Sequence, residues 1–387
     1  MKKALFALLI VVAYLLAWPT RVAPRAWVPP PAPPTDRGPY AYNEALKDVQ
    51  RLAVEVGIGP EGIAVDATGR VYAGYRDGRV IVLSADGASY TELGNTGGRP
   101  LGIGFSPTGG LVIADGVRGL LQLGGKPPPT LLSAAADGGP FRFTDDVDDA
   151  KLGHQVYFTD ASSKFAYPDY VDDLLEHGAN GRLLAYDLDT RKTAVLLRDL
   201  YFANGVAVGP DDAYVLVNET SAYRITRYWL KGPKAGSHEI FVDGLPGFPD
   251  NLSFNGRDRF WVAIASPRDP MLDALAAHPF LRKIVARLPA FLQPGPKKHS
   301  WVLGFDLDGR LVANLQYAGR DAYAPITSVQ EHGPWLYFGS LNEDAIARLP
   351  LRNVIPGAPP PPPGWRDVPA HPQAARLPAQ KEVEEKD

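Results

Sequence analysis

The chain has 387 residues with a net charge of −3, 45% hydrophobic and 10% aromatic residues, 39 glycines and 38 prolines, a composition typical of a globular protein rich in turns and short strands. This charge, without a basic stripe, excludes nucleic acid as a partner. The absence of cysteine excludes disulfides, thiolate metal sites and a cysteine nucleophile, and favours a bacterial envelope protein.

The first segment, Met1–Trp18, has two lysines followed by an apolar run of about fifteen residues. Residues such as Pro19 stand where a cleavable signal needs small side chains. We therefore favour an uncleaved membrane anchor within residues 1–27, with a cleaved signal as the alternative. Lys2 and Lys3 place the N-terminus in the cytoplasm, so the body is expected on the periplasmic or extracytoplasmic side.

Proline-rich and charged segments flank the body. Val28–Thr35 favours polyproline II and predicts a stiff spacer within a linker over residues 28–50, which would hold the body off the membrane. Residues 353–387 contain a proline run and an acidic end without apolar periodicity, and predict a poorly ordered tail. The folded body is therefore expected over residues 51–352.

A unit of short predicted strands and turns recurs through the body. The repeated unit begins with a polar residue and a strand of pattern G-[IV]-x-[VF], and continues with alternating apolar and polar runs between turns. A spacing of about forty residues or more is that of a four-stranded propeller blade. We predict an all-β, six-bladed β-propeller rather than an array of immunoglobulin-like sandwiches. Its units are counted at Gly62, Gly102, Asp146, Gly205, Asn251 and Thr327.

Two segments complete or interrupt the repeats. The last unit has three clear strands, and Leu52–Val56 is expected to supply the fourth and close the ring, which would remove exposed strand edges. Met271–Leu292 has leucine, isoleucine and valine at helical spacing, and predicts one inserted amphipathic helix. This helix is expected to pack over the propeller rim; the alternative is a lid that also touches the membrane surface.

Polar residues precede the first strand of several units, and the innermost strands of a propeller line a central channel. Their side-chain oxygens should therefore point at a common axis. Carboxylate and amide oxygens suit a hard cation, Ca²⁺ before Mg²⁺, and a cation would relieve the repulsion between converging carboxylates. The alternative is that these are ordinary turn formers. The residues concerned are Glu61, Asp145, Asp146, Asn204, Asp250 and Asn251.

Other catalytic systems have no signature in the sequence. We find no histidine or cysteine pattern for zinc, no G-x-S-x-G elbow, no phosphate-binding G-x-x-x-x-G-K loop and no H-E-x-x-H motif. Ser162 and Ser163 have no histidine placed by the sequence to activate them, so we interpret them as part of a turn.

Several motifs resemble, in order, those of a known family: YFTDASSKF, GRLLAYDLDTRK, FANGVAV, YVLVNET, LPGFPDNLS and VQEHGPWLYFGSL. Over roughly residues 57–351, and in the plan of its N-terminal anchor, the chain resembles the strictosidine synthase-like family, in particular the adipocyte plasma membrane-associated protein branch. The resemblance implies a six-bladed β-propeller related to paraoxonases and gluconolactonases, in agreement with the count of repeats.

The resemblance also implies roles for single residues. Glu61 resembles the first-blade glutamate that binds catalytic calcium in the wider superfamily, and Asn204 resembles its asparagine ligand. Asp250 and Asn251 resemble the paired ligands of paraoxonase-like members. Asp145 lies where relatives have asparagine, a change that keeps an oxygen ligand and adds negative charge.

Two positions depart from the pattern of well-known members. The catalytic glutamate of true strictosidine synthases corresponds to Thr327, which cannot act as that base, so alkaloid synthesis is not expected. A histidine of paraoxonases corresponds to Leu101. The resemblance therefore implies that hydrolysis would need a metal or a carboxylate in place of that histidine.

We predict a membrane-anchored, calcium-dependent hydrolase of esters or lactones, with the membrane and a small-molecule ester or lactone as its partners. The alternatives are a non-catalytic binding or scaffold propeller with a structural cation, and a sugar-lactone hydrolase of the gluconolactonase type. The predicted catalytic carboxylates are Asp250 and Asp145, and the predicted metal ligands are Glu61, Asp145, Asn204, Asp250 and Asn251.

Overall fold

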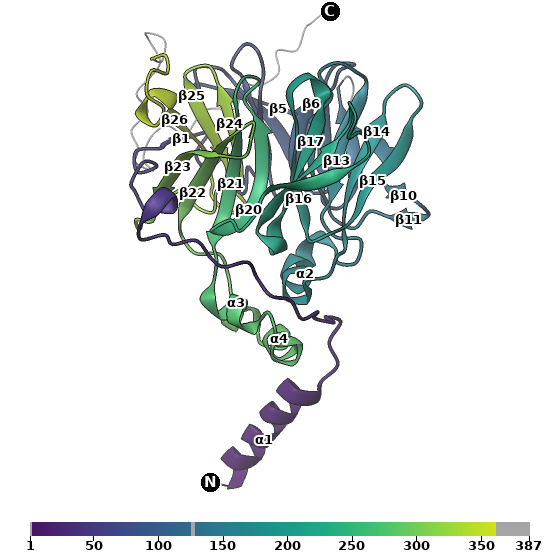
Figure 1. Ribbon diagram of the computed structural model, residues 1–387, viewed down its shortest axis with the longest axis vertical. Helices are drawn as coiled ribbons and strands as arrows, with labels where there is room; N and C mark the ends of the chain where they lie inside the picture. Colours follow the sequence, from purple (N-terminus) through teal and green to yellow (C-terminus); the bar gives the residue numbers. More distant parts are fainter. Residues whose placement is uncertain (1, 125–127, 361–387) are drawn as a thin grey trace, which may run out of the picture.

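The computed structural model describes residues 2–124 and 128–360, in which six four-stranded antiparallel sheets surround a central axis (Figure 1). The six-bladed β-propeller is therefore confirmed. In the five sheets built from consecutive strands, the first strand lies innermost, and the innermost strands of all six sheets contact one another around the axis. Of the predicted tail, residues 361–387 lie outside the described residues.

The strands of the first five blades follow chain order. They are β2–β5 (Ile63–Val65, Val71–Gly74, Arg79–Leu83, Tyr90–Asn95), β6–β9 (Pro100–Phe105, Leu111–Asp115, Gly119–Leu123, Thr130–Ser133), β12–β15 (Thr144–Asp149, Gln155–Asp160, Gly181–Asp187, Lys192–Leu200), β16–β19 (Ala203–Val208, Tyr214–Glu219, Arg224–Trp229, His238–Val242) and β20–β23 (Gly247–Phe254, Arg259–Pro267, Ser300–Asp306, Leu311–Tyr317). A small hairpin, β10–β11 (Ala135–Ala136, Gly139–Pro140), lies between the second and third blades.

The sixth blade joins the two ends of the body. Its strands β24–β26 (Ser328–His332, Trp335–Gly339, Ile346–Pro350) are completed by β1, Gln50–Leu52, which pairs antiparallel with β26. The predicted closure of the ring by an N-terminal strand is confirmed, although the strand begins earlier and stops at Leu52. It stops because Ala53 and Glu55 have left-handed backbone conformations, with φ of 51° and 62°.

Apolar clusters fill the spaces between neighbouring blades. The cluster between the fourth and fifth blades, for example, contains Leu216, Phe260 and Trp301, all fully buried. Near the axis the blades approach more closely still. A Cβ atom added to Gly205 of β16 would lie 2.5 Å from the Cα of Asn251 in the next inner strand. The glycine of the repeated G-[IV]-x-[VF] pattern therefore lets adjacent inner strands pack backbone to backbone.

The α-helices of the described chain gather at one end of the propeller (Figure 1). None of them is long and apolar enough to cross a membrane, so the expected anchor stays a prediction. Short 3₁₀ turns occur at η1 (Gly38–Tyr40), η2 (Tyr167–Asp169), η3 (Pro210–Asp212), η4 (Thr220–Ala222), η5 (Ala290–Leu292) and η6 (Leu351–Asn353). The α-helices are α1 (Lys2–Ala17), α2 (Tyr170–Glu176), α3 (Pro270–Leu275) and α4 (Pro279–Ala286).

The single inserted helix predicted over Met271–Leu292 is wrong. The segment forms two short helices, α3 and α4, and the turn η5. Pro279 occupies the first turn of α4, and the residue before it, His278, has φ of −120° and ψ of 76°, outside the helical region. Proline disfavours a helical conformation in the residue that precedes it, so the apolar periodicity continues across a break in the backbone.

The predicted spacer lies against the body instead of standing free. We call residues 21–31 the strap. Within it, the backbone N–H of Arg25 donates to Glu176 O at 3.0 Å, and that of Trp27 donates to Ala276 O at 3.2 Å. Arg268 Nη1 donates to Pro30 O at 2.7 Å. The strap therefore crosses the helical end of the propeller on its way from α1 to β1.

Candidate active site

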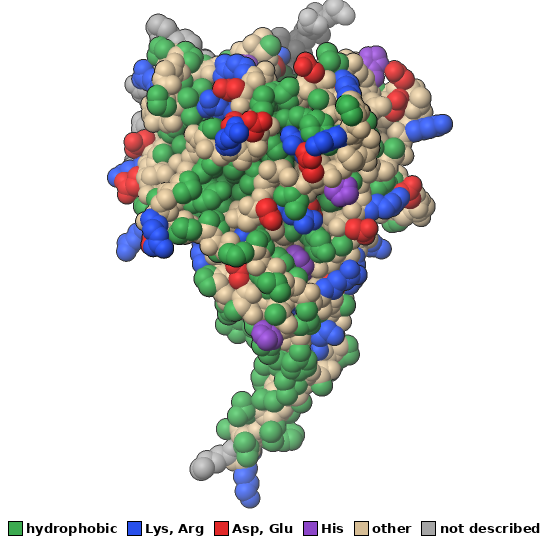
Figure 2. Space-filling model, viewed as in Figure 1, with side chains coloured by type: hydrophobic (Ala, Val, Ile, Leu, Met, Phe, Trp, Pro, Cys, Tyr) green, Lys and Arg blue, Asp and Glu red, His purple; other side chains and the backbone are tan. Residues whose placement is uncertain are grey.

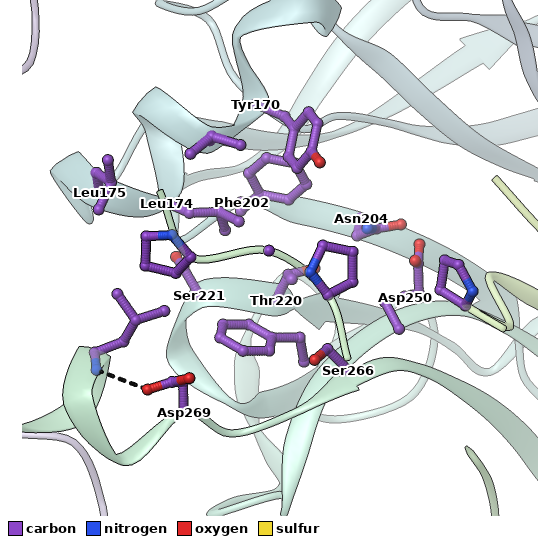
Figure 3. Close-up of a pocket in the computed structure, with 18 of the residues that line it drawn as sticks. Tyr170, Leu174, Leu175, Phe202, Asn204, Thr220, Ser221, Asp250, Ser266 and Asp269 are labelled. Atoms are coloured by element: carbon purple, nitrogen blue, oxygen red, sulfur yellow. Dashed lines mark hydrogen bonds between the residues drawn. The ribbon is translucent and has the colours of Figure 1, made fainter. Parts of the chain in front are cut away.

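A cavity opens at the helical end of the central channel. The inner strands form its deep end, while α2, α3, α4 and the strap form its sides. Figure 3 shows Asn204 and Asp250 at one end of the cavity and Leu174 and Leu175 toward the other. Most of the wall is apolar, and the polar groups lie mainly at the deep end. The residues that line the cavity include Trp27, Glu61, Phe143, Asp145, Tyr170, Leu174, Leu175, His177, Phe202, Asn204, Ser221, Phe248, Asp250, Asp269 and Thr327.

The structure brings together most, but not all, of the predicted site residues. Glu61, Asp145, Asn204 and Asp250 line this cavity. Asn251 does not; it lines a second cavity further along the inner strands. Glu61 precedes its inner strand as expected. The other residues lie inside their strands, at points where the pairing with the next strand shifts register. At this bulge of the fifth blade, the adjacent Asp250 and Asn251 line different cavities.

The carboxyls at the deep end destabilise one another's charged forms. Burial raises the pKa of the Asp145 carboxyl well above its ordinary range, and the Glu61 and Asp250 carboxylates raise it further. Burial and the Glu61 carboxylate also raise the pKa of Asp250, against an opposing hydrogen bond from the Asn204 side chain. Asp145 and Asp250 therefore favour a bound proton or a neighbouring cation.

Glu61 already has a cationic partner, which the sequence did not reveal. Arg99 Nη2 lies 3.0 Å from Glu61 Oε2, and both side chains are nearly fully buried, at 3% and 6% exposure. Arg99 Nη1 also donates to Gly59 O at 2.9 Å, and its Nε to the Tyr167 hydroxyl at 3.3 Å. This arginine offsets part of the cost of burying Glu61, and it binds the carboxylate through Oε2.

The donor atoms at the deep end suit a hard cation. Asp145 Oδ2 and Asn204 Oδ1 are buried and have no hydrogen-bond partner among the described residues. Such atoms are rare in folded proteins unless an ion or a ligand satisfies them. No group of three or more Asp, Glu, His or Cys side chains in the described chain is close enough to hold a metal by itself. A cation here would therefore need amide oxygens, which Ca²⁺ accepts readily.

The second cavity has a different character. Burial raises the pKa of Asp146, which lines it, to about 8. The same carboxylate is held by the backbone N–H groups of Val147 and Val206, both at 2.9 Å. Asp146 thus connects the third and fourth blades and serves the structure of the channel.

Aromatic residues form much of the wall above the carboxyls. The rings of Phe143 and Phe202 pack edge to face, with centroids 5.4 Å apart. His177 stacks between Trp27 and Tyr201, at 3.8 Å and 4.6 Å. Burial and two nearby arginines lower the pKa of His177 to about 3, so the ring is neutral at physiological pH. No pattern in the sequence indicates this stack, because its three rings come from distant segments.

Comparison with known proteins places this site in a family. The family model described as "Strictosidine synthase-like, N-terminal" matches residues 38–83, and the model described as "Strictosidine synthase" matches residues 145–233. Protein strictosidine synthase-like 6 of Arabidopsis thaliana is 39% identical over 320 residues, covering 81% of this chain and 84% of the relative. The chain belongs to the strictosidine synthase-like family. Adipocyte plasma membrane-associated protein of Salmo salar is 33% identical, over 83% of this chain and 82% of that protein.

Solved structures agree with the fold of this strictosidine synthase-like protein. A gluconolactonase from Xanthomonas campestris superposes with a TM-score of 0.56 at 16% identity, covering 78% of this chain and 94% of the other. The calcium-binding protein regucalcin from Agrobacterium tumefaciens superposes with a TM-score of 0.55 at 16% identity, covering 78% and 93%. At this identity the likeness establishes the propeller architecture.

Thr327 and Leu101, the two positions that depart from the pattern of well-known members, have different surroundings in the structure. Thr327 is buried at the cavity, and its hydroxyl donates to the Glu61 backbone oxygen at 3.4 Å. Leu101 is fully buried in an apolar cluster with Phe143 and Phe202. Among the described residues, the carboxyl groups that line the cavity come from the first, third and fifth blades and from Asp269, in the loop before α3.

Proposed function

We propose that this strictosidine synthase-like protein hydrolyses esters or lactones in the cavity, with calcium bound at its deep end. The observation that carries the proposal is the pair of buried carboxyls, Asp145 and Asp250, at the end of a largely apolar cavity. An apolar wall suits the hydrocarbon part of an ester, and the carboxyls suit the reacting end.

Calcium would be held by oxygens of Asp145, Asn204 and Asp250, with Glu61 Oε1 as a further donor. When bound, it would supply a Lewis acid that polarises the substrate carbonyl and stabilises developing negative charge. In this proposal Asn251 is not a ligand of the same ion, because it lines the other cavity.

Side chains of the cavity would carry out proton transfer, positioning and the exclusion of water. Asp250 takes a proton from the water that adds to the carbonyl carbon; the carbon–oxygen bond then breaks, and the leaving alkoxide receives the proton. Asn204 lies beside Asp250 at the deep end of the cavity (Figure 3) and favours the charged form of the Asp250 carboxyl. Arg99 holds Glu61 in place, and the Phe143–Phe202 pair excludes water from the acyl group.

We also propose that α1 attaches the protein to a membrane. Its apolar side chains are exposed, for example Leu5 at 59% and Phe6 at 67%, and Figure 2 shows them covering the narrow end of the molecule. Exposed apolar patches of this kind mark interaction surfaces. A relative named for association with the plasma membrane supports the proposal. Lys2 and Lys3 would then leave the body on the extracytoplasmic side.

The test is hydrolysis of phenyl acetate and a panel of small lactones by the full chain in detergent. We expect turnover that requires calcium and disappears with a chelator, because the buried carboxyls need a cation to bring a carbonyl oxygen among them. Calcium binding without turnover of any substrate on the panel would contradict the hydrolase and favour a binding propeller with a structural cation.

The dependence of stability on pH gives a second prediction. Asp145 and Asp250 have folded-state pKa values above the unfolded value of about 4. Groups shifted upward stabilise the fold at low pH and lose that contribution as pH rises through the folded pKa. In chelator we therefore expect the melting temperature to fall between pH 5 and pH 8.

Calcium should reverse this loss where the carboxylates are charged. The melting temperature should rise on adding calcium much more at pH 8 than at pH 5, measured by differential scanning calorimetry. An equal rise at the two pH values would show that calcium binds away from these carboxyls.

A further inference from the structure

One wall of the cavity comes from outside the propeller. Trp27 belongs to the strap, yet its indole lines the cavity. It stacks face to face on His177, with centroids 3.8 Å apart and an interplanar angle of 9°. It also contacts the Tyr223 ring at 5.9 Å. The last residue of the segment predicted as a membrane anchor thus contributes a large, flat side chain to the ligand space.

The backbone of the strap is held on both sides of Trp27, independently of the indole. Before it, Arg25 is bonded twice: its N–H donates to Glu176 O, and its carbonyl accepts from Arg282. After it, Pro30 O accepts from Arg268 at 2.7 Å. Val22, 2% exposed, anchors the start of the strap in an apolar cluster with helices α2 and α4. A substitution at position 27 should therefore alter the wall and leave the path of the strap unchanged.

The partner ring is fixed as firmly as the strap. His177 ends α2 in the left-handed conformation, with φ of 50° and ψ of 47°, and its N–H donates to Asp173 O at 2.9 Å. On its other face the imidazole stacks on Tyr201. Trp27, His177 and Tyr201 therefore form a continuous stack of rings with little freedom to move aside for a bulky ligand.

We propose that Trp27 is a specificity-determining residue, which limits the bulk of the group admitted to the cavity and favours ligands with a small or flat apolar group. The effect of Trp27 on turnover rests on the hydrolase proposed above. The effect of Trp27 on binding does not rest on it, since the wall is present whether or not the site turns over substrate.

The experiment compares Trp27→Ala with Trp18→Ala in the full chain. Trp18 is a matched control because it is 61% exposed, precedes the strap and does not line the cavity. The readout is the ratio of kcat/KM for p-nitrophenyl decanoate to that for p-nitrophenyl acetate. Trp27→Ala should raise this ratio about 10-fold, because bulky acyl groups gain room and small ones lose an aromatic contact worth up to about 1.5 kcal/mol.

Trp18→Ala should change the ratio less than about 2-fold, and Trp27→Phe should restore most of the wild-type preference. Equal ratios in Trp27→Ala and Trp18→Ala would overturn the proposal. Circular dichroism and melting of each variant establish that it folds.

A binding measurement separates this inference from the hydrolase. The neutral fluorescent probe N-phenyl-1-naphthylamine is titrated into each variant without any substrate. Its Kd should rise about 5-fold in Trp27→Ala through loss of the stacking wall, and stay within about 2-fold in Trp18→Ala. If Trp27→Ala weakens binding of the probe but the wild type turns over no substrate, the hydrolase is refuted and Trp27 remains a specificity residue. If the Kd of Trp27→Ala is unchanged, the role of Trp27 is refuted.

Discussion

Replacing Asp250 with asparagine should lower kcat for ester or lactone hydrolysis by about 100-fold or more, since a positioned acid–base group contributes about 10²–10⁴-fold. The amide keeps the shape and one oxygen of the carboxylate but cannot accept the proton from water. It also removes the repulsion with the Glu61 carboxylate that raises the pKa of Asp250. The variant should therefore melt cooperatively, at pH 8 in chelator no lower than the wild type.

The matched control is Asp243→Asn, in the same segment of the chain. Asp243 is exposed, and its Oδ1 accepts from the Gly244 N–H at 2.8 Å, which an asparagine oxygen can also do. We expect wild-type kcat from it. Activity of Asp250→Asn within a few fold of wild type, measured at saturating calcium, would remove Asp250 from the mechanism.

Replacing Gly205 with alanine should destabilise the protein by about 3 kcal/mol or more, at the upper end of the cost of overpacking. The added methyl group would lie 2.5 Å from the Cα of Asn251 and 2.6 Å from the backbone oxygen of Asp250. Backbone atoms cannot rotate away as a side chain can, so the fourth and fifth blades would have to separate. The same displacement would move Asp250, and activity should fall with stability.

Gly153→Ala is the corresponding control. Gly153 lies in an exposed turn, and an added Cβ there would have its nearest neighbour at 3.9 Å. Its free energy of unfolding, measured by denaturant titration, should stay within about 0.5 kcal/mol of wild type. A similar small change in Gly205→Ala would mean that the inner strands are not closely packed.

The sequence was sufficient for the propeller because each blade repeats its own local signals. The glycine of the G-[IV]-x-[VF] pattern marks the close approach of inner strands, and turns separate the alternating runs. Local signals failed where a single residue determines the backbone conformation. Pro279 divides the inserted helix although apolar periodicity continues past it, and the left-handed Ala53 ends β1 before the apolar run does.

In the candidate site, too, some residues could be predicted from the sequence and others could not. Glu61, Asp145, Asn204 and Asp250 could be predicted to meet because each holds the same place in its blade. The register shift of β20 at Asp250 and Asn251 was missed, and Asn251 lines the second cavity. Trp27 and Arg99 reach the site through tertiary contacts, for which spacing in the sequence carries no information.

The closing strand has a consequence for the order of events during synthesis. β1 leaves the ribosome early, but its partner β26 is made almost 300 residues later: Arg348 Nε donates to Gln50 Oε1 across a separation of 298 residues. Contacts between such distant residues form slowly, because a long loop must close first. The sixth blade also supplies Thr327 to the cavity. We therefore expect the nascent chain to hold five blades as an open arc, and to acquire its ligand space only when translation is nearly complete.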